Sequence, residues 1–249
     1  MGIQKIELSE VKDIIAKARL VGYGSFGDVY DIGNDQLFKF YYEKFKIDNK
    51  CTTIESKISA IDQNFAKCLR DYSILQEVIK NGALVPIEDD FPDIIERYRM
   101  YTRYKVMQAS RSVKRSSPPR ELIFAGDRNF GENNLALVGS ILKREEGVEL
   151  EDVMMNVSRD DVKTKRKLEE NLYDGYMELM DHGIYTFDLK SDNIIVNPDT
   201  LETKIIDLDD PCTEYYDQVN KEKRAKMFSE IDQMFSYEIE KRHGFQFKR

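Results

Sequence analysis

The sequence predicts an α+β fold with a β-rich first part and a mainly helical second part. Short alternating segments separated by glycines occur early in the chain, which is typical of antiparallel strands. Apolar residues recur at helical spacing over 167–180 and 221–241. A polar connection with one glycine lies between these parts, and we therefore divide the chain into 1–142, a connection over 143–147, and 148–249.

Composition and charge exclude several classes of protein. The chain of 249 residues is long enough to bury a core without disulfides, and its net charge of −8 argues against nucleic acid as a partner. It contains no apolar run near the roughly 18 residues that a membrane span needs, and it begins without the apolar core of a signal peptide. Its three cysteines lack disulfide or zinc-site spacing. We therefore expect a soluble protein of a reducing cytosol, with no membrane span.

The first elements are a predicted amphipathic helix over 10–20, with Ser9 as its N-cap, and then three strands. The strands are predicted over 19–21, 28–32 and 36–42, and Gly33-Asn34-Asp35 forms the turn before the third.

Three glycines between the first two strands, Gly22, Gly24 and Gly27, form a GxGxxG pattern. A dinucleotide-binding fingerprint would continue into a helix. Here the alternation continues through Val29, which favours a loop that covers phosphates at the edge of an antiparallel sheet. A glycine-rich hairpin without a ligand is the alternative.

Lys39 lies between Phe38 and Phe40 on the third strand. Alternation places its side chain on the opposite face from the two rings, where an ammonium group could reach phosphate oxygens. A solvated strand lysine is the alternative.

The middle of the chain predicts helices over 53–81 and 91–107, strands over 83–87 and 135–142, and a loop over 109–120. A later strand is predicted over 203–208. The window from Arg97 to Arg120 carries eight basic residues and no acid. We interpret it as a docking surface for an acidic partner or an autophosphorylation segment, since it contains Ser110, Ser112, Ser116 and Ser117. A solvated, mobile insertion is the alternative.

The stretch 185–196, YTFDLKSDNIIV, brings Asp188, Lys190 and Asn193 onto one short turn before an apolar run. Asp207 follows a second apolar run. Phosphoryl transfer needs groups that cradle phosphates, hold metal ions and orient the attacking hydroxyl. The order of glycine loop, strand lysine, Asp with an Asn five residues later, and a further Asp supplies a candidate for each role.

With these motifs the chain resembles the protein-kinase family, and DLKSDN is similar to that family's DLKPEN. The resemblance implies a two-lobed fold that uses ATP and Mg²⁺. Asp188 would orient the substrate hydroxyl, Lys190 would steady the transferred phosphate, and Asn193 and Asp207 would hold Mg²⁺. Lys190 favours a Ser/Thr protein kinase over a small-molecule kinase, which remains an alternative.

The resemblance also implies a set of nucleotide-binding residues: Gly22, Gly24, Ser25, Gly27, Val29, Lys39, Asp71, Leu142 and Glu149. Asp71 most nearly aligns with the helix acid that pairs with the strand lysine. Glu77 and Glu55 are alternatives for that acid.

The chain departs from the family pattern at several points. Thr186 and Phe187 replace the His-Arg before the catalytic Asp, so we expect no control by an activation-loop phosphate. Leu208 and Asp209 replace the Phe-Gly of DFG. Only 42 residues follow Asp207, without an APE motif, and the insertion over 91–134 has no counterpart.

In these departures the chain is similar to the minimal kinases secreted by enteric pathogens, the OspG and NleH family. This likeness implies a bacterial effector in a host cytosol, with a ubiquitin-conjugating enzyme carrying ubiquitin as its partner. The rival interpretation is a pseudokinase that acts as a binding module for ubiquitin or that conjugate.

Overall fold

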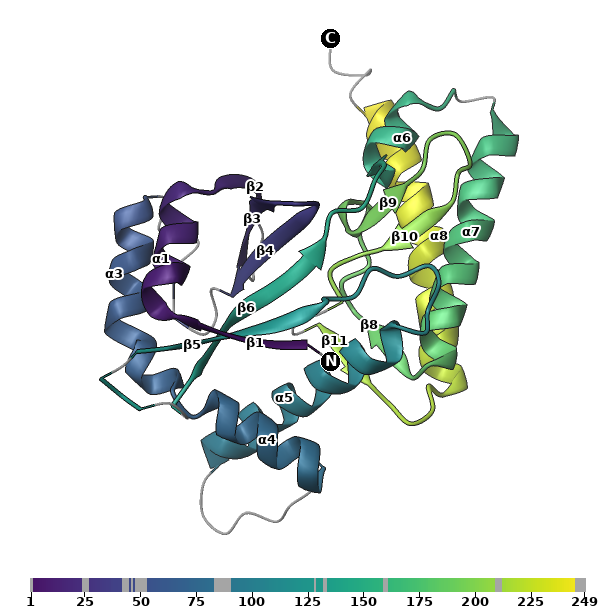
Figure 1. Ribbon diagram of the computed structural model, residues 1–249. Coiled ribbons are helices and arrows are strands. Elements are labelled where there is room, and N and C mark those ends of the chain that lie inside the picture. Colours follow the sequence, from purple (N-terminus) through teal and green to yellow (C-terminus); the bar gives the residue numbers. More distant parts are fainter. Residues whose placement is uncertain are drawn as a thin grey trace. The chain divides into compact units, whose positions relative to one another are not determined.

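The computed structural model describes residues 2–23, 27–41, 45, 47, 53–82, 91–127, 129–131, 134–158, 161–208 and 212–244 (Figure 1). The chain forms two compact units. Unit 1 comprises Met1–Tyr104 and Pro119–Arg144, and unit 2 comprises Lys105–Pro118 and Glu145–Arg249. The chain passes from unit 1 to unit 2 between residues 144 and 145, within the predicted connection over 143–147. Residues 105–118 also belong to unit 2, although they come before that connection in the sequence.

Unit 1 is built on a mixed sheet, which agrees with the predicted α+β class. Its described strands follow the order β1-β5-β6-β4-β3-β2, where β1 and β5 are parallel and the other neighbours are antiparallel. The bounds are Gly2–Glu7 (β1), Arg19–Tyr23 (β2), Gly27–Gly33 (β3), Gln36–Tyr41 (β4), Glu121–Gly126 (β5) and Ala136–Lys143 (β6). The glycine-separated strands and the strand near 135–142 are therefore confirmed.

The start of the chain differs from its prediction. It opens with strand β1 and not with a helix, and α1 follows at Leu8–Lys17. Glu7 is the N-cap, and Glu10 closes a capping box by accepting from the Glu7 amide at 3.1 Å. The predicted cap, Ser9, lies inside the first turn of the helix because the reciprocal Glu7–Glu10 pair starts it earlier.

The predicted helix over 53–81 is interrupted. The structure has α3 at Ile54–Asn64, a 3₁₀ turn η1 at Phe65–Cys68, and α4 at Asp71–Asn81. Gly82 ends α4 with a φ of 76°, as the Asn-Gly signal predicted. The predicted strand over 83–87 lies outside the described residues. Helix α5, Phe91–Ser110, is confirmed and extends three residues beyond its predicted end.

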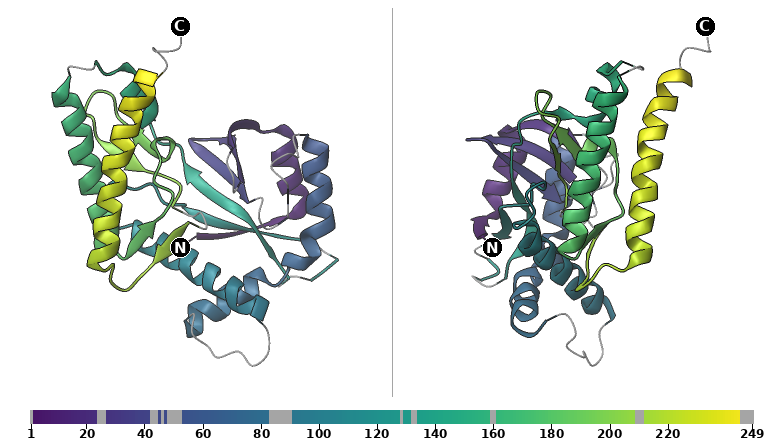
Figure 2. Two further views of the ribbon diagram at one scale, coloured as in Figure 1. Left: turned by 180° about the vertical axis from the view of Figure 1, so that it is seen from behind. Right: turned by 90° about the vertical axis from the view of Figure 1, so that its right-hand side faces the viewer.

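The core of unit 1 lies against one face of the sheet. Phe38 and Phe40 of β4 share a buried cluster with Val11 and Ile15 of α1 and with Ile61 of α3. Helices α1 and α3 run beside each other in Figure 1 and in the left view of Figure 2. Because side chains alternate along β4, Lys39 belongs to the other face.

Unit 2 contains α6 at Leu150–Asn156, α7 at Val162–Asp181 and α8 at Lys221–Gly244. Helix α7 begins five residues before its prediction, because Asp161 caps it by accepting from the Thr164 amide at 3.0 Å. The predicted stop at His182-Gly183 and the predicted final helix are confirmed. Within the described residues, no helix is apolar over a length that could cross a bilayer.

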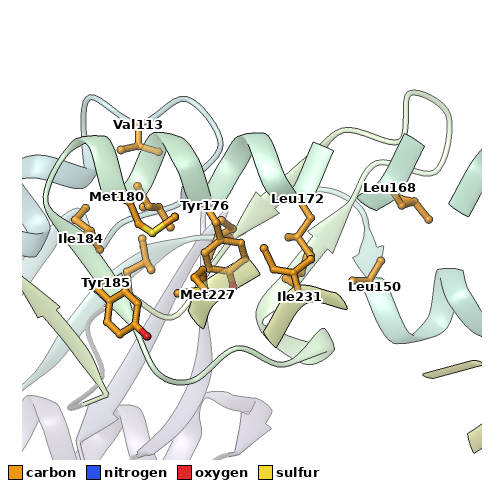
Figure 3. Packing of buried hydrophobic residues seen from close by; sticks show 14 of the residues in the cluster. Val113, Leu150, Leu168, Leu172, Tyr176, Met180, Ile184, Tyr185, Met227 and Ile231 are labelled. Atoms are coloured by element: carbon orange, nitrogen blue, oxygen red, sulfur yellow. The ribbon is translucent and has the colours of Figure 1, made fainter. Parts of the chain in front are cut away.

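Two small sheets complete unit 2. One has the order β10-β9-β7, from Thr203–Ile205, Ile194–Val196 and Val148–Glu149, so the strand predicted over 203–208 is shorter than expected. The other pairs β11, Thr213–Tyr215, with β8, Ile184–Thr186. Figure 3 shows the core between α7, α8 and this strand pair, where Tyr176, Met180, Tyr185, Met227 and Ile231 pack together.

Candidate active site

The segment between β8 and β9, residues 187–193, is called the Asp188 loop below. Strand pairing fixes its start, since the Phe187 amide donates to the Cys212 carbonyl at 2.8 Å, next to the β8–β11 pair. The Asp188 amide donates to Thr186 Oγ1 at 3.2 Å. The loop ends in a 3₁₀ turn, η2, at Ser191–Asn193, which leads directly into β9. Both ends of the loop are thus fixed by regular structure.

The structure brings together three predicted site residues in this loop. Asn193 Nδ2 donates to Asp188 Oδ2 at 2.9 Å and to the Asp188 carbonyl oxygen at 3.1 Å. Lys190 Nζ lies 3.0 Å from the same Oδ2 atom. One carboxylate oxygen therefore receives both an amide and an ammonium donor, which fixes the orientation of the Asp188 side chain.

Asp207 lies close to this group. The Ile206 amide donates to the Asn193 carbonyl at 2.9 Å, which ties the start of the Asp207 segment to the loop. Partial burial lowers the pKa of Lys190, but its hydrogen bond to Asp188 and the charges of Asp188, Asp192 and Asp207 outweigh that effect and raise the pKa. All three carboxylates therefore lie within electrostatic reach of one ammonium group.

The backbone of Asp207 adopts a left-handed conformation, with a φ of 62°. This region is uncommon for residues other than glycine, although Asp tolerates it better than most. Strained backbone is concentrated at functional sites because surrounding structure must hold it in place. Asn34, Asp35 and Leu201 share this backbone conformation in or beside turns, so it supports a functional role for Asp207 only together with the neighbouring Asp188 loop.

Asn193 and Asp207 carry oxygen atoms of the type that Mg²⁺ binds. Because Asn193 Nδ2 is used by Asp188, its Oδ1 atom remains as an acceptor, and Asp207 supplies a carboxylate. Mg²⁺ takes few protein ligands and completes its shell with phosphate oxygens and water. Among the described residues, no group of three or more His, Cys, Asp or Glu side chains is arranged to hold a metal ion.

In unit 1, Lys39 lies opposite Val29 on β3 and Ser140 on β6. It belongs to the face away from the core of Phe38 and Phe40, as alternation predicted. Its exposed fraction is only 4%, so the alternative of a solvated strand lysine is wrong.

The three candidate acids for Lys39 differ sharply in environment. Asp71 is also 4% exposed, and its Oδ2 accepts from the Leu137 amide of β6 at 2.9 Å. Glu77 is exposed and forms an ion pair with Arg97, and Glu55 is exposed in the first turn of α3. A buried ammonium needs a buried counter-charge, which favours Asp71. The pairing of Lys39 with Asp71 stays a prediction.

The glycine pattern is only partly described. Gly22 lies on β2 opposite Val29, whereas Gly24 and Ser25 lie outside the described residues. At Gly27, a Cβ atom would lie 2.0 Å from the Phe40 carbonyl oxygen. Strands β3 and β4 therefore approach too closely here for any residue but glycine.

A buried ion pair next to Gly27 was not among the residues predicted from the sequence. Asp28 accepts hydrogen bonds from Lys57 of α3 and, at 2.8 Å, from the Tyr30 hydroxyl. Asp28 pairs with Phe40 in the sheet, so this cluster lies on the core face and not on the Lys39 face. The alternation of β3 could have indicated that Asp28 points inward, but nothing local identifies Lys57 as its partner.

Leu142 and Glu149 occupy different units. Leu142 pairs with Leu37 within the sheet of unit 1. Glu149 pairs with Ile195 in unit 2, and partial burial together with the charges of Asp192, Asp152 and Glu151 raises its pKa.

The part of the basic window that belongs to unit 2, residues 105–118, packs against that unit and is not solvated throughout. Arg115 lies 3.2 Å from Asp174 and donates to the Asn171 carbonyl at 2.6 Å, and the Lys114 amide donates to Glu178 at 2.9 Å. The predicted loop over 109–120 forms a β-bridge from Ser116 to Ile205. The alternative of a solvated, mobile insertion therefore does not describe this segment.

Three of the four serines in the window are buried. Ser110 donates to the Val106 carbonyl at 2.6 Å, Ser116 to the Ser110 carbonyl at 2.9 Å, and Ser117 to Glu145 at 2.7 Å. Ser112 is exposed. Modification of the buried three would require local unfolding, which leaves Ser112 as the accessible hydroxyl of this set.

Comparison with known proteins returns no family model and no curated protein that matches this chain.

Proposed function

We propose that the protein is an ATP- and Mg²⁺-dependent protein kinase that phosphorylates Ser or Thr hydroxyls. The observation that carries the proposal is the double hydrogen bond from Asn193 to Asp188, with Lys190 on the same carboxylate oxygen. Positioning is most of what a phosphoryl-transfer catalyst provides. A carboxylate that two donors orient suits the task of aligning a hydroxyl.

In this proposal each of the four candidate catalytic and metal-binding residues of unit 2 has a role. Asp188 orients the acceptor hydroxyl and accepts its proton, and Lys190 stabilises the negative charge of the transferred phosphoryl group. Asn193 Oδ1 and the Asp207 carboxylate hold magnesium. When bound, Mg²⁺ neutralises charge on the phosphate oxygens.

Unit 1 supplies the nucleotide contacts in this proposal. Lys39 contributes an ammonium group to the phosphates, and the β2–β3 glycine segment covers them through its backbone. Gly27 supports that role because its close approach to Phe40 fixes the strand at the end of the segment. Gly24 and Ser25 keep their sequence-based assignment, and so do Val29, Leu142 and Glu149.

The resemblance to the kinase family carries the finer features of the proposal. A mixed sheet in unit 1 and helices α6, α7 and α8 in unit 2 are compatible with a two-lobed fold. The resemblance alone supports a reduced effector kinase in a host cytosol and a ubiquitin-charged conjugating enzyme as partner.

Transfer of labelled phosphate from ATP to a generic protein acceptor tests the proposal. We expect activity that Asp188→Ala and Lys39→Ala each reduce by at least about a hundredfold, since each removes a group that acts on the reacting atoms or the phosphates. Asp199→Asn, at an exposed turn outside the site, is the matched control. Activity that survives both alanine substitutions would overturn the proposal.

The rival function is a pseudokinase that binds nucleotide or a protein partner without turnover. Asp71, which is shorter than the family's Glu, and the replacement of the Phe-Gly of DFG by Leu208 and Asp209 keep this rival open. Thermal stabilisation by Mg²⁺ and ATP, without phosphate transfer to protein or to a hydroxylated small molecule, would support this rival. Transfer to the small molecule alone would instead identify a small-molecule kinase.

A further inference from the structure

Lys223, in the first turn of α8, lies among three aromatic rings. Its Nζ atom is 4.4 Å from the ring centroid of Tyr216, 4.9 Å from that of Tyr185 and 5.4 Å from that of Phe187. The same atom donates to the Tyr216 hydroxyl at 2.6 Å and lies 3.5 Å from Glu214 Oε2. These distances are within the range of cation–π attraction, which strengthens where water is partly excluded.

Two of these rings belong to the segment that leads into Asp188. Tyr185 lies on β8, and Phe187 immediately precedes Asp188. Their rings meet edge to face, with centroids 4.8 Å apart. Phe187 is 45% exposed, so the protein core alone does not hold it in place. Besides the Tyr185 ring, the ammonium group of Lys223 is one of the contacts that hold the Phe187 ring from outside the core.

The neighbours of Lys223 are held by the same strand pair. Glu214 lies opposite Tyr185 in the β8–β11 pair, and the Tyr216 amide donates to the Gly183 carbonyl at 2.8 Å. The Tyr216 hydroxyl in turn donates to Glu214. Lys223 therefore joins α8 to both strands at the point where the chain enters the Asp188 loop.

We propose that Lys223 is a positioning residue, which holds Tyr185 and Phe187 and through them keeps Asp188 in its active orientation. This inference rests on the proposed kinase function.

The protonation of Lys223 fits this role. The hydrogen bond to Tyr216 and the charge of Glu214 raise the pKa of Lys223, although partial burial acts in the opposite direction. The ammonium form, which cation–π attraction requires, is therefore maintained at neutral pH. A second lysine, Lys226, lies 5.6 Å from the Phe187 ring and 3.6 Å from Glu230, and it is more exposed.

The test compares Lys223→Met with Lys221→Met. Methionine keeps the length and apolar packing of the stem and removes the charge. Lys221 is an exposed lysine of the same helix, so its variant controls for lost charge on α8. We expect Lys223→Met to lower kcat about tenfold with an unchanged KM for ATP, and Lys221→Met to leave both within about twofold.

Rescue separates positioning from bulk stability. Lys223→Arg restores a cation that stacks on aromatic rings, and it should recover at least about a third of wild-type kcat. A purely structural role would lower melting temperature and kcat together, without this recovery. Equal kcat in Lys223→Met and the wild type would overturn the inference, and so would failure of the Arg variant to recover activity.

Hydrogen–deuterium exchange of the amides over 185–188 gives a readout that does not need activity. We expect Lys223→Met to speed this exchange at least about fivefold, since the Phe187 amide loses its fixed geometry, while Lys221→Met does not. If the wild type transfers no phosphate, the kinase proposal fails. In that case unchanged exchange overturns the inference as well, and faster exchange upholds Lys223 as the residue that holds this segment.

Discussion

Asn193 reaches Asp188 twice, through one amide nitrogen that donates to the carboxylate at 2.9 Å and to the main-chain carbonyl at 3.1 Å. The two residues stand at opposite ends of a six-residue turn, so a single side chain closes the loop and orients its acid. The Asn193 side-chain amide therefore both closes the Asp188 loop and orients the Asp188 carboxylate.

Replacing Asn193 with alanine should reduce kcat by at least about a hundredfold, because the orientation of Asp188 is lost together with one of the two proposed magnesium ligands. The free energy of unfolding should fall by about 1–2 kcal/mol, as two hydrogen bonds are removed. Steady-state kinetics and urea unfolding measure the two effects. A kcat within threefold of the wild type would contradict the assigned role.

The pairing of Lys39 with Asp71 can be measured by a double-mutant cycle with Lys39→Met and Asp71→Asn. The Asn side chain can still accept from the Leu137 amide, so the cycle isolates the charge. We expect a coupling energy of about 1–3 kcal/mol, since each single variant leaves a buried charge without compensation. Additive losses in urea unfolding would show that the two residues do not interact.

Local patterns predicted the parts of the fold that local geometry decides. Alternation between Phe38 and Phe40 placed Lys39 on the correct face, because side chains of a strand point to opposite sides. Gly82 and Gly183, with φ of 76° and 81°, end helices at the predicted positions because they adopt a left-handed backbone at little cost. The same reasoning found the turn that carries Asp188 and Asn193.

Contacts between distant segments were beyond local patterns. Strand β1 pairs in parallel with β5, where Gly2 lies opposite Glu121, and no short signal predicts a partner so far along the chain. Lys57 and Asp28 are 29 residues apart in the sequence. Lys223 of α8 contacts the rings of Tyr185 and Phe187, which lie on and just after β8. Such pairs depend on tertiary packing, which periodicity does not encode.

Asp31 should make stability depend on pH in acid solution. The Gly33 amide donates to it at 3.0 Å, Arg19 at 2.9 Å, and Arg144 lies at 2.7 Å, and these groups lower its pKa from 3.8 to about 2. Because the folded state has the lower pKa, the stabilisation is fully present above about pH 4 and is lost as the pH falls through 2.

The matched comparison for this effect is Asp31→Asn, which keeps the turn geometry and removes the charge. We expect its melting temperature to lie below that of the wild type at pH 6, and the difference to shrink between pH 4 and pH 2. Thermal unfolding followed by circular dichroism measures this difference. A gap that stays constant over that range would show that the arginines do not stabilise the ionised form of Asp31.

The folded protein should be more stable when Tyr176 of α7 is replaced by phenylalanine. Its side chain is buried in the core of unit 2, and its hydroxyl has no hydrogen-bond partner among the described residues. Burial and the nearby charges of Asp188 and Glu230 raise its pKa, so the neutral hydroxyl is retained. Because an unpaired buried hydroxyl is costly, Tyr176→Phe should raise the free energy of unfolding by about 1 kcal/mol.

Tyr173, on the same helix, provides the control, since its hydroxyl donates to Asp232 of α8. Tyr173→Phe removes a hydrogen bond to a charged acceptor and should lower the free energy of unfolding by about 1–2 kcal/mol. The same substitution, Tyr to Phe, should therefore change the free energy of unfolding in opposite directions at the two positions. Urea unfolding of the two variants measures these changes. If both variants lose stability equally, the Tyr176 hydroxyl has a stabilising partner, and the prediction is wrong.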